Sequence, residues 1–315
     1  MKILMISGDP GVLDSNTDTG KRMAEYREAF GEPASPAGGL DILAAYGNVF
    51  RFSSSFFSGL KMFFRKKYDV ITAQDMEHAF LVWIFSKLFR VPWQMQIHTD
   101  ILSPYFWKGS FKNKIRVVLA KFLIPRANCV RVVSDRIKRS LVKLNKDLSG
   151  PDKITVLPIF VDAEKIRQMP IKTDLHKKYP GRFIILMASR IPKEKNIELA
   201  IETVSLIRAN KRILLLIVGD GREIENLKFK TYNFGLNKNV VFEPHTDDLV
   251  SYYKTCDLFL LTSNYEGYGM TLVEAASAGA KIISSYVGIA PEPKIHRALN
   301  GAQKAFEVYM KLTKV

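Results

Sequence analysis

Short apolar runs alternate with longer segments of helical periodicity along the whole chain. In the first half, the runs predict strands at residues 2–6, 69–73, 93–98, 129–133 and 154–157. The segments between them predict helices at 20–30, 55–66, 77–89, 111–124 and 135–146, and a loop over the Pro- and Gly-rich residues 32–39. Such alternation is typical of parallel sheets with helices on both faces.

The alternation resumes after a charged connector. A strand at 183–187 precedes a helix that Asn196 opens as N-cap, and further strands are predicted at 213–218, 239–242, 257–262 and 281–285. Prolines punctuate residues 158–180, which indicates a domain boundary there. The sequence therefore predicts an α/β protein of two Rossmann-like doubly wound domains facing a cleft, with domains at 1–165 and 166–295 and a terminal helix at 296–315.

Length and composition agree with two domains and indicate the cellular compartment of the protein. The chain has 315 residues, of which 47% are hydrophobic, enough to bury a large core. Its two cysteines lie far apart in apolar surroundings, which argues against a disulfide framework or a zinc site. The opening residues predict a strand rather than a signal peptide, and no apolar run approaches the roughly 20 residues that span a bilayer. We expect a cytoplasmic protein.

The positive charge is large and unevenly distributed. The formal net charge is +16, and residues 108–146 hold twelve Lys or Arg against one acidic residue, Asp135. Such a region favours polyanions: nucleic acid, an anionic membrane or a phosphorylated substrate. Within it, an apolar stripe at helical spacing either packs on the sheet or lies on an anionic leaflet at the inner membrane face; its members are Ile115, Val118, Leu119 and Phe122. The basic-aromatic run at 61–67 favours the membrane alternative.

Two carboxylates in the second half carry the strongest chemical signal. Glu266 lies in a glycine-rich loop after a predicted strand, and Glu274 lies in the helix that follows. A helix N-terminus offers free N–H groups to phosphate, and glycines let the backbone approach a ligand. This segment resembles the Glu-x7-Glu signature of retaining GT-B glycosyltransferases of family 4, which use nucleotide sugars. The resemblance implies that Glu266 contacts the transferred hexose, that Glu274 binds ribose hydroxyls, and that the intervening residues line the donor: Gly267, Tyr268, Gly269, Met270 and Thr271.

Two further loops after strands resemble the same family. Arg190 and Lys195 are similar to the family's basic pair, which clamps the donor diphosphate and stabilises its developing charge. Gly219 and Gly221 resemble its Gly-Asp-Gly turn near the nucleotide. A dinucleotide fingerprint is excluded there because Ile224 stands where the third glycine belongs.

In the first half, the resemblance rests mainly on one strand end. His98 is similar to the family's histidine that contacts the transferred sugar from the acceptor side, and Asp100 would help to orient the acceptor hydroxyl. The loop after the first strand, residues 8–20, would open onto the same cleft. The connector 157–162 resembles the family's Pro-x-Gly-Val-Asp, with Phe160 in place of glycine.

The resemblance implies a glycosyltransferase that moves a hexose from a nucleotide diphosphate sugar to a glycan or glycolipid, without metal or cofactor. Front-face transfer would need no carboxylate nucleophile, and domain closure would exclude water. One departure matters: only residues 293–315 follow the last matching segment, so the second domain is expected to be short. Three alternatives therefore stay open: a degenerate GT-B protein that binds a nucleotide sugar or partner without catalysis, a sugar-nucleotide epimerase, and a nucleic-acid-binding protein, which no motif supports.

Overall fold

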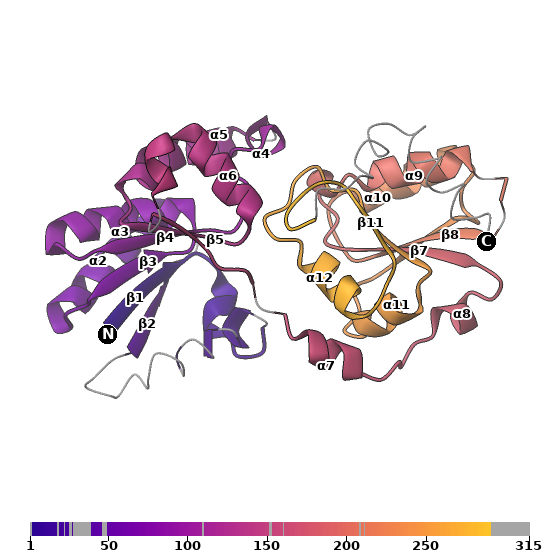
Figure 1. Cartoon of the computed structure of the whole chain (residues 1–315), viewed down its shortest axis with the longest axis horizontal. Helices are drawn as coiled ribbons and strands as arrows, with labels where there is room; N and C mark the ends of the chain where they lie inside the picture. The colour runs from indigo at the N-terminus through magenta and orange to yellow at the C-terminus, as the bar shows by residue number, and fades with distance from the viewer. Residues whose placement is uncertain are drawn as a thin grey trace. The chain divides into compact units, whose positions relative to one another are not determined.

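The computed structural model describes residues 2–17, 19–21, 23–24, 27, 39–45, 49–108, 110–150, 153–159, 161–207, 209–210 and 212–290 (Figure 1). The chain divides into two compact units, Met1–Pro158 and Ile159–Val315. The boundary predicted from the sequence, after residue 165, lies seven residues later. The helix predicted at 296–315 and most of the one predicted at 20–30 lie outside the described residues.

The first unit is built on a six-stranded sheet in which every described pairing is parallel. Its strand order is β2-β1-β3-β4-β5-β6. The strands are β1 (Lys2–Ser7), β2 (Gly39–Ala44), β3 (Val70–Ala73), β4 (Trp93–Ile97), β5 (Cys129–Val132) and β6 (Ile154–Val156). Strands buried from both sides read as continuous apolar runs, which is why periodicity located most of them.

The strand order decides which face of the sheet the helices of the first unit cover. They are α2 (Val49–Arg65), α3 (Met76–Phe89), α4 (Pro104–Lys108), α5 (Phe111–Leu123) and α6 (Asp135–Leu144), with 3₁₀ turns at Pro10–Leu13, Ile124–Arg126 and Lys146–Ser149. From β2 to β6 the connections run in one direction across the sheet, so right-handed crossovers place α2, α3, α5 and α6 on one face. The β1–β2 connection runs the other way. The chain connections therefore run in opposite directions on the two sides of the boundary between the neighbouring strands β1 and β3.

The second unit holds a five-stranded parallel sheet of order β11-β10-β7-β8-β9. Its strands are β7 (Phe183–Ala188), β8 (Ile213–Val218), β9 (Val240–Glu243), β10 (Leu258–Leu261) and β11 (Ile282–Ser284). Its helices are α7 (Ala163–Gln168), α8 (Leu175–Lys178), α9 (Ile197–Leu206), α10 (Ile224–Asn233), α11 (Leu249–Thr255) and α12 (Met270–Ser277), with a 3₁₀ turn at Lys193–Lys195. The chain leaves β7 in one direction and β10 in the other, so the two directions part between these neighbouring strands.

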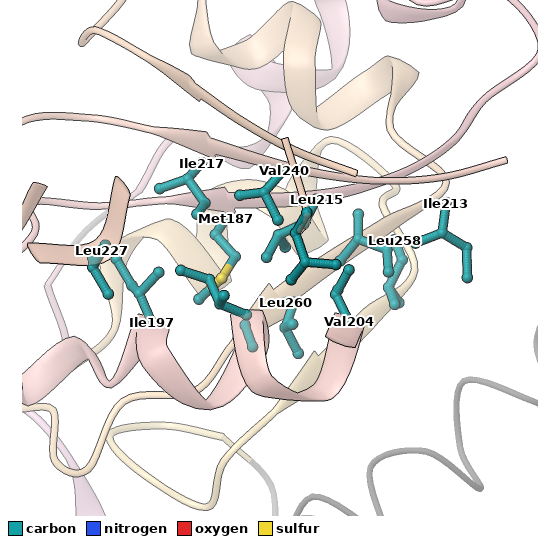
Figure 2. Close-up of a cluster of buried hydrophobic side chains, with 14 of the residues drawn as sticks. Met187, Ile197, Val204, Ile213, Leu215, Ile217, Leu227, Val240, Leu258 and Leu260 are labelled. Atoms are coloured by element: carbon teal, nitrogen blue, oxygen red, sulfur yellow. The ribbon is translucent and has the colours of Figure 1, made fainter. Parts of the chain in front are cut away.

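Two apolar layers cover the faces of the second sheet. One joins β7 and β8 to α9 and α10 through Met187, Val204, Leu215 and Leu227 (Figure 2). The other face packs under α8, α11 and α12 through residues that include Leu175, Tyr253 and Leu272. Because side chains alternate along a strand, both layers draw on the same strands. The double layer holds the carboxyl ends of these strands in fixed register.

One strand was not predicted. Gly39–Ala44 forms β2, although the sequence placed a loop up to Gly39 and no strand after it. Only Leu40 of this strand is buried, because β2 is the edge of the sheet and has one neighbour, β1. Asp41 also interrupts its apolar residues, so β2 lacks the continuous apolar run that marked the other strands.

Asn196 stands at the N-cap of α9, where the sequence placed it, but its side chain does not cap the helix. Its backbone is left-handed, with φ 49° and ψ 41°, and its amide nitrogen lies 3.4 Å from Asn264 Oδ1. The side chain therefore ties together the loops after β7 and β10.

The apolar stripe of α5 does not pack on the sheet. Ile115, Val118 and Phe122 are 48%, 67% and 38% exposed, and the buried side chains of this helix are Ala120 and Leu123. Packing on the sheet, one of the two interpretations of this stripe, is therefore wrong for these three residues. Among the described helices, none is both long and apolar enough to cross a membrane.

Replacing Leu215 with Ala tests the core of the second unit. Leu215 lies in β8, which has the neighbours β7 and β9 in the sheet, and is fully buried (Figure 2). The change leaves a cavity, so we expect the free energy of unfolding in urea to fall by about 2–5 kcal/mol. Leu206→Ala is the matched control, because Leu206 is 53% exposed and its loss should cost less than about 0.5 kcal/mol. Equal effects of the two changes would contradict this placement.

Candidate functional site

An ion pair stands where the connections of the second sheet part. Lys195, at the end of the turn after β7, donates from Nζ to Glu266 Oε1 at 2.5 Å, and Glu266 belongs to the loop after β10. Both side chains are largely buried, 17% and 14% exposed. In open parallel sheets, ligands bind at the carboxyl ends of strands at such a switch point. The structure thus brings together two residues predicted from separate motifs.

Hydrogen bonds fix this pair from both loops. Ser263 donates to the same oxygen, Glu266 Oε1, at 2.7 Å, and Ser285 in turn donates to the Ser263 carbonyl at 2.6 Å. Thr262, the first residue after β10, donates to the carbonyls of Lys195 and Asn196 at 3.0 and 2.9 Å. Because these hydroxyls and carbonyls are pinned, the two charged side chains keep one geometry.

The loop after β8 comes against the loop after β7 at the two predicted glycines. Gly219 has φ 137°, and a Cβ there would lie 2.0 Å from the Ser189 carbonyl oxygen. A Cβ on Gly221 would lie 2.4 Å from the Ile191 carbonyl oxygen. Backbone contacts this close exclude any side chain, so the glycines set the path of the loop.

The loop from Glu266 leads directly into α12. Gly269 has φ 89° and forms the N-cap, so Met270 and Thr271 occupy the first turn of the helix. Tyr268 is half-buried and its carbonyl accepts from the Ile289 N–H at 3.0 Å, while Gly267 is buried. The predicted donor-lining residues therefore lie in one continuous segment beside Glu266.

Glu274 is held by a buried tyrosine that the sequence did not single out. The Tyr253 hydroxyl, on α11, donates to Glu274 Oε2 at 3.1 Å. Tyr253 is 1% exposed and packs edge-on against Phe259, with ring centroids 5.4 Å apart. Burial raises the pKa of Tyr253 well above its ordinary value, and the neighbouring carboxylate adds to the rise. The hydroxyl thus stays protonated and orients the carboxylate.

Arg190 is exposed in the loop after β7 and influences Tyr265. Burial raises the pKa of Tyr265, as do the charges of Glu194 and Glu266, whereas Arg190 acts in the opposite direction. The guanidinium therefore lies within electrostatic range of the same loop as Glu266.

The two site residues predicted in the first unit have different surroundings. His98 follows β4 directly and is half-buried. Asp100 accepts from the Ser140 hydroxyl at 3.2 Å, and burial raises its pKa, although that bond and the charge of Arg136 lower it. One carboxylate oxygen of Asp100 is thus committed to α6.

A second, partly buried pair of side chains occupies the switch point of the first sheet, between β1 and β3. Asp75 accepts from the Gly8 N–H at 2.9 Å and from His78 Nδ1 at 2.6 Å. Burial lowers the pKa of His78, but the hydrogen bond and charge of Asp75 outweigh it and raise the pKa overall. Sequence reasoning missed this pair, because Gly8 and Asp75 lie 67 positions apart and an Asp-x-x-His spacing alone reads as an ordinary helix cap.

No group of three His, Cys, Asp or Glu side chains in the described part of the chain gathers as a metal site would require.

Comparison with protein families accounts for most of the chain. Residues 22–159 match the family described as glycosyl transferase 4-like domain, and residues 170–303 match glycosyl transferases group 1.

Curated relatives share about a quarter of their residues with this chain. The chain is 26% identical over 242 residues to UDP-Gal:alpha-D-GlcNAc-diphosphoundecaprenol alpha-1,3-galactosyltransferase of Escherichia coli, covering 74% of this chain and 62% of the relative. It is 25% identical over 185 residues to the capsular polysaccharide biosynthesis glycosyltransferase CapM of Staphylococcus aureus, covering 56% and 48%. The chain thus spans about half to three fifths of the length of these relatives.

Solved structures share the fold over the whole chain. Anabaena Alr3699/HepE in complex with UDP has a TM-score of 0.74 at 19% identity, and sucrose-phosphate synthase from Thermosynechococcus elongatus has 0.76 at 17%. Each comparison covers 100% of this chain and 90% of the other. At these identities the likeness shows the fold, which is that of GT-B glycosyltransferases.

The His78–Asp75 pair predicts a pH-dependent stability. A raised His78 pKa stabilises the fold fully below its ordinary value of 6.5 and less as pH rises through the folded value. The lowered Asp75 pKa contributes fully above 3.8 and is lost as pH falls through the folded value. The stability lost in His78→Asn should therefore be largest between pH 3.8 and pH 6.5. It should shrink as the pH rises through the pKa of His78 in the folded protein. Urea unfolding of both proteins from about pH 5 to 9 measures this; a loss independent of pH would contradict the charged pair.

Proposed function

We propose that this chain, whose two halves match two glycosyl transferase families, transfers a hexose from a nucleotide diphosphate sugar to a glycan or glycolipid acceptor. The transfer retains the configuration at the anomeric carbon and uses no metal ion. The observation that carries the proposal is the Lys195–Glu266 pair at the switch point of the second sheet.

Lys195 and Arg190 supply the positive charge that a departing nucleoside diphosphate needs. As the bond from the anomeric carbon to the phosphate oxygen breaks, negative charge grows on that oxygen. Fixed cations stabilise this charge, and losing one such contact costs roughly 2.7–4 kcal/mol in comparable sites. Lys195 is already held by Glu266, so it needs little reorganisation to serve the diphosphate.

The remaining donor contacts follow from the segment 266–274. Glu266 accepts hydroxyls of the transferred hexose, and Glu274, oriented by Tyr253, accepts the ribose hydroxyls. The free N–H groups at the start of α12 face phosphate, aided by the helix dipole. Gly219 and Gly221 hold the loop after β8 against the loop after β7, beside the nucleotide.

The first unit serves the acceptor. His98 lines the acceptor side of the transferred sugar, and Asp100, which also accepts from Ser140, orients the acceptor hydroxyl. The acceptor hydroxyl forms its bond to the anomeric carbon on the face that the diphosphate leaves, and its proton passes to the departing phosphate oxygen. That balance requires no carboxylate nucleophile and yields retention.

The relatives' printed names support a lipid-linked acceptor and a uridine nucleotide. The Escherichia coli relative is named for a diphosphoundecaprenol acceptor and a UDP-Gal donor, and the Anabaena structure holds UDP. We therefore propose a glycolipid acceptor, which the protein would meet at the inner face of the cytoplasmic membrane.

Calorimetric titration with UDP, GDP and ADP, each alone and as its glucose conjugate, tests the donor site. Selective binding of one base supports the proposal, and binding without any turnover points to a degenerate scaffold. With an acceptor in hand, proton NMR of the product reads the anomeric configuration, and EDTA tests the metal. An inverted product, or activity lost to EDTA and restored by Mg²⁺, would overturn those parts of the proposal.

Glu274→Gln should weaken binding of the selected nucleotide about 10- to 150-fold, because a hydrogen bond to a charged group contributes about 1.5–3 kcal/mol. The amide oxygen still accepts from Tyr253, so the helix keeps its place. Glu225→Gln is the control, because Glu225 is exposed on α10. Calorimetry of the three proteins measures the change; equal affinities would remove Glu274 from the site.

His98→Ala should lower kcat while leaving nucleotide affinity within about twofold, because His98 belongs to the unit that does not hold the donor. A fall of 10²-fold or more is expected if the imidazole contacts the reacting sugar. Steady-state kinetics and calorimetry of the same preparation separate the two effects. Weaker nucleotide binding with unchanged kcat would reverse the assignment.

A further inference from the structure

The outer face of α5 is apolar. Phe111, Ile115, Val118 and Phe122 follow at spacings of four, three and four, so they lie along one side of the helix. They are 77%, 48%, 67% and 38% exposed. An amphipathic helix on a sheet ordinarily turns this side inward, and exposed apolar area costs about 25 cal/mol per Å².

Polar contacts lock α5 in this orientation. On its inner side, Arg116 donates to Glu77 on α3 at 2.8 and 2.5 Å, and Asn113 donates to the Phe106 carbonyl of α4 at 2.9 Å. Ala120 and Leu123 fill the remaining contact with the core. Rotating the helix to bury the stripe would break both polar contacts, so the outward stripe is a property of the fold.

The surroundings of the stripe are positive. Between Pro104 and Asn128 the sequence contains no Asp or Glu, and it holds six basic residues: Lys108, Lys112, Lys114, Arg116, Lys121 and Arg126. The Arg126 guanidinium lies 3.8 Å above the Phe122 ring. Of the six, Arg116 and Lys112 pair with Glu77. Lys114 and Lys121 are exposed beside the stripe.

Neighbouring helices extend the pattern. On α4, Tyr105 and Trp107 are 58% and 40% exposed, and these residue types concentrate where a membrane meets water. On α2, Phe57 and Phe64 are 66% and 78% exposed and flank the exposed Lys61. Phe64 contacts Phe89 of α3, the helix that α5 also packs on, so α2 and α5 belong to one layer.

We infer that the outer face of α5, with α4, docks on an anionic lipid surface. Apolar side chains in the centre and cations at the rim match acyl chains below charged headgroups. A nucleic-acid surface would demand polar or stacking side chains at the centre, and Ile115 and Val118 offer neither.

The lipid-docking inference rests on the proposed function only in its biological role, which is to bring the protein to a lipid-linked acceptor. The same unit carries His98, and only residues 99–103 separate it from α4. A unit seated on the bilayer through α4 and α5 would receive a lipid-linked acceptor at the strand end that carries His98.

Co-sedimentation of the full chain with phosphatidylcholine vesicles, with and without 30% phosphatidylglycerol, tests the surface. Wild type should bind the anionic vesicles and lose affinity as salt rises. Phe111→Ser with Val118→Ser should weaken binding at least tenfold. Lys114→Gln with Lys121→Gln should weaken it about 25-fold, or about fivefold for each lysine. The matched control is Phe229→Ser with Tyr232→Ser on α10, which removes equally exposed aromatics and should bind like wild type.

All substituted side chains are exposed, and circular dichroism verifies folding. Absence of binding to anionic vesicles, equal binding by the stripe variant and wild type, or tighter binding to duplex DNA would each overturn the inference. The outcome is independent of the donor site, because vesicle binding needs no nucleotide. Calorimetry of the stripe variant with the nucleotide should match wild type, so a failure here and a failure of the proposed function remain distinguishable.

Discussion

The parting of the chain connections between β7 and β10 is the constraint on which the second unit depends. Both strands are buried from two sides, so neither can shift without disrupting an apolar layer. Their following loops must turn to opposite faces, which leaves backbone and side chains converging at the strand ends. Lys195 and Glu266 meet there, and the hydroxyls of Thr262 and Ser263 tie the loops that carry them. The position of the charges is thus a consequence of strand order.

Most of the sheet positions could be predicted from the sequence, because strands covered on both faces read as unbroken apolar runs. β2 could not, since Asp41 interrupts its apolar residues. The motif residues of the second unit were also predictable, and topology places Lys195 and Glu266 at one sheet edge. Their direct contact was not predictable, and neither was the Tyr253–Glu274 bond, because Tyr253 reads as a core aromatic. Spacing along a chain does not encode which hydroxyl meets which carboxylate.

The orientation of α5 is a second feature that periodicity in the sequence could not predict. The stripe of Ile115, Val118 and Phe122 predicts a helix but not the direction that its apolar side faces. That direction depends on where Arg116 finds a carboxylate, and Glu77 lies 39 positions away on α3. The partly exposed Arg116–Glu77 pair thus fixes α5 in an orientation that leaves three apolar side chains exposed.

Both units cover a parallel sheet with helices, but the helices of the two units turn their apolar side chains in different directions. In the second, both sheet faces are covered by apolar layers, and the charged groups gather at the strand ends. In the first, the switch point is also closed by a charged pair, Asp75 and His78, but the helical layer turns apolar side chains outward. A surface that must only stay in water gains nothing from this arrangement, and the exposed hydrocarbon favours association. Charge at the rim restricts that association to anionic partners, which is why we infer an anionic lipid surface as the occupant of this face.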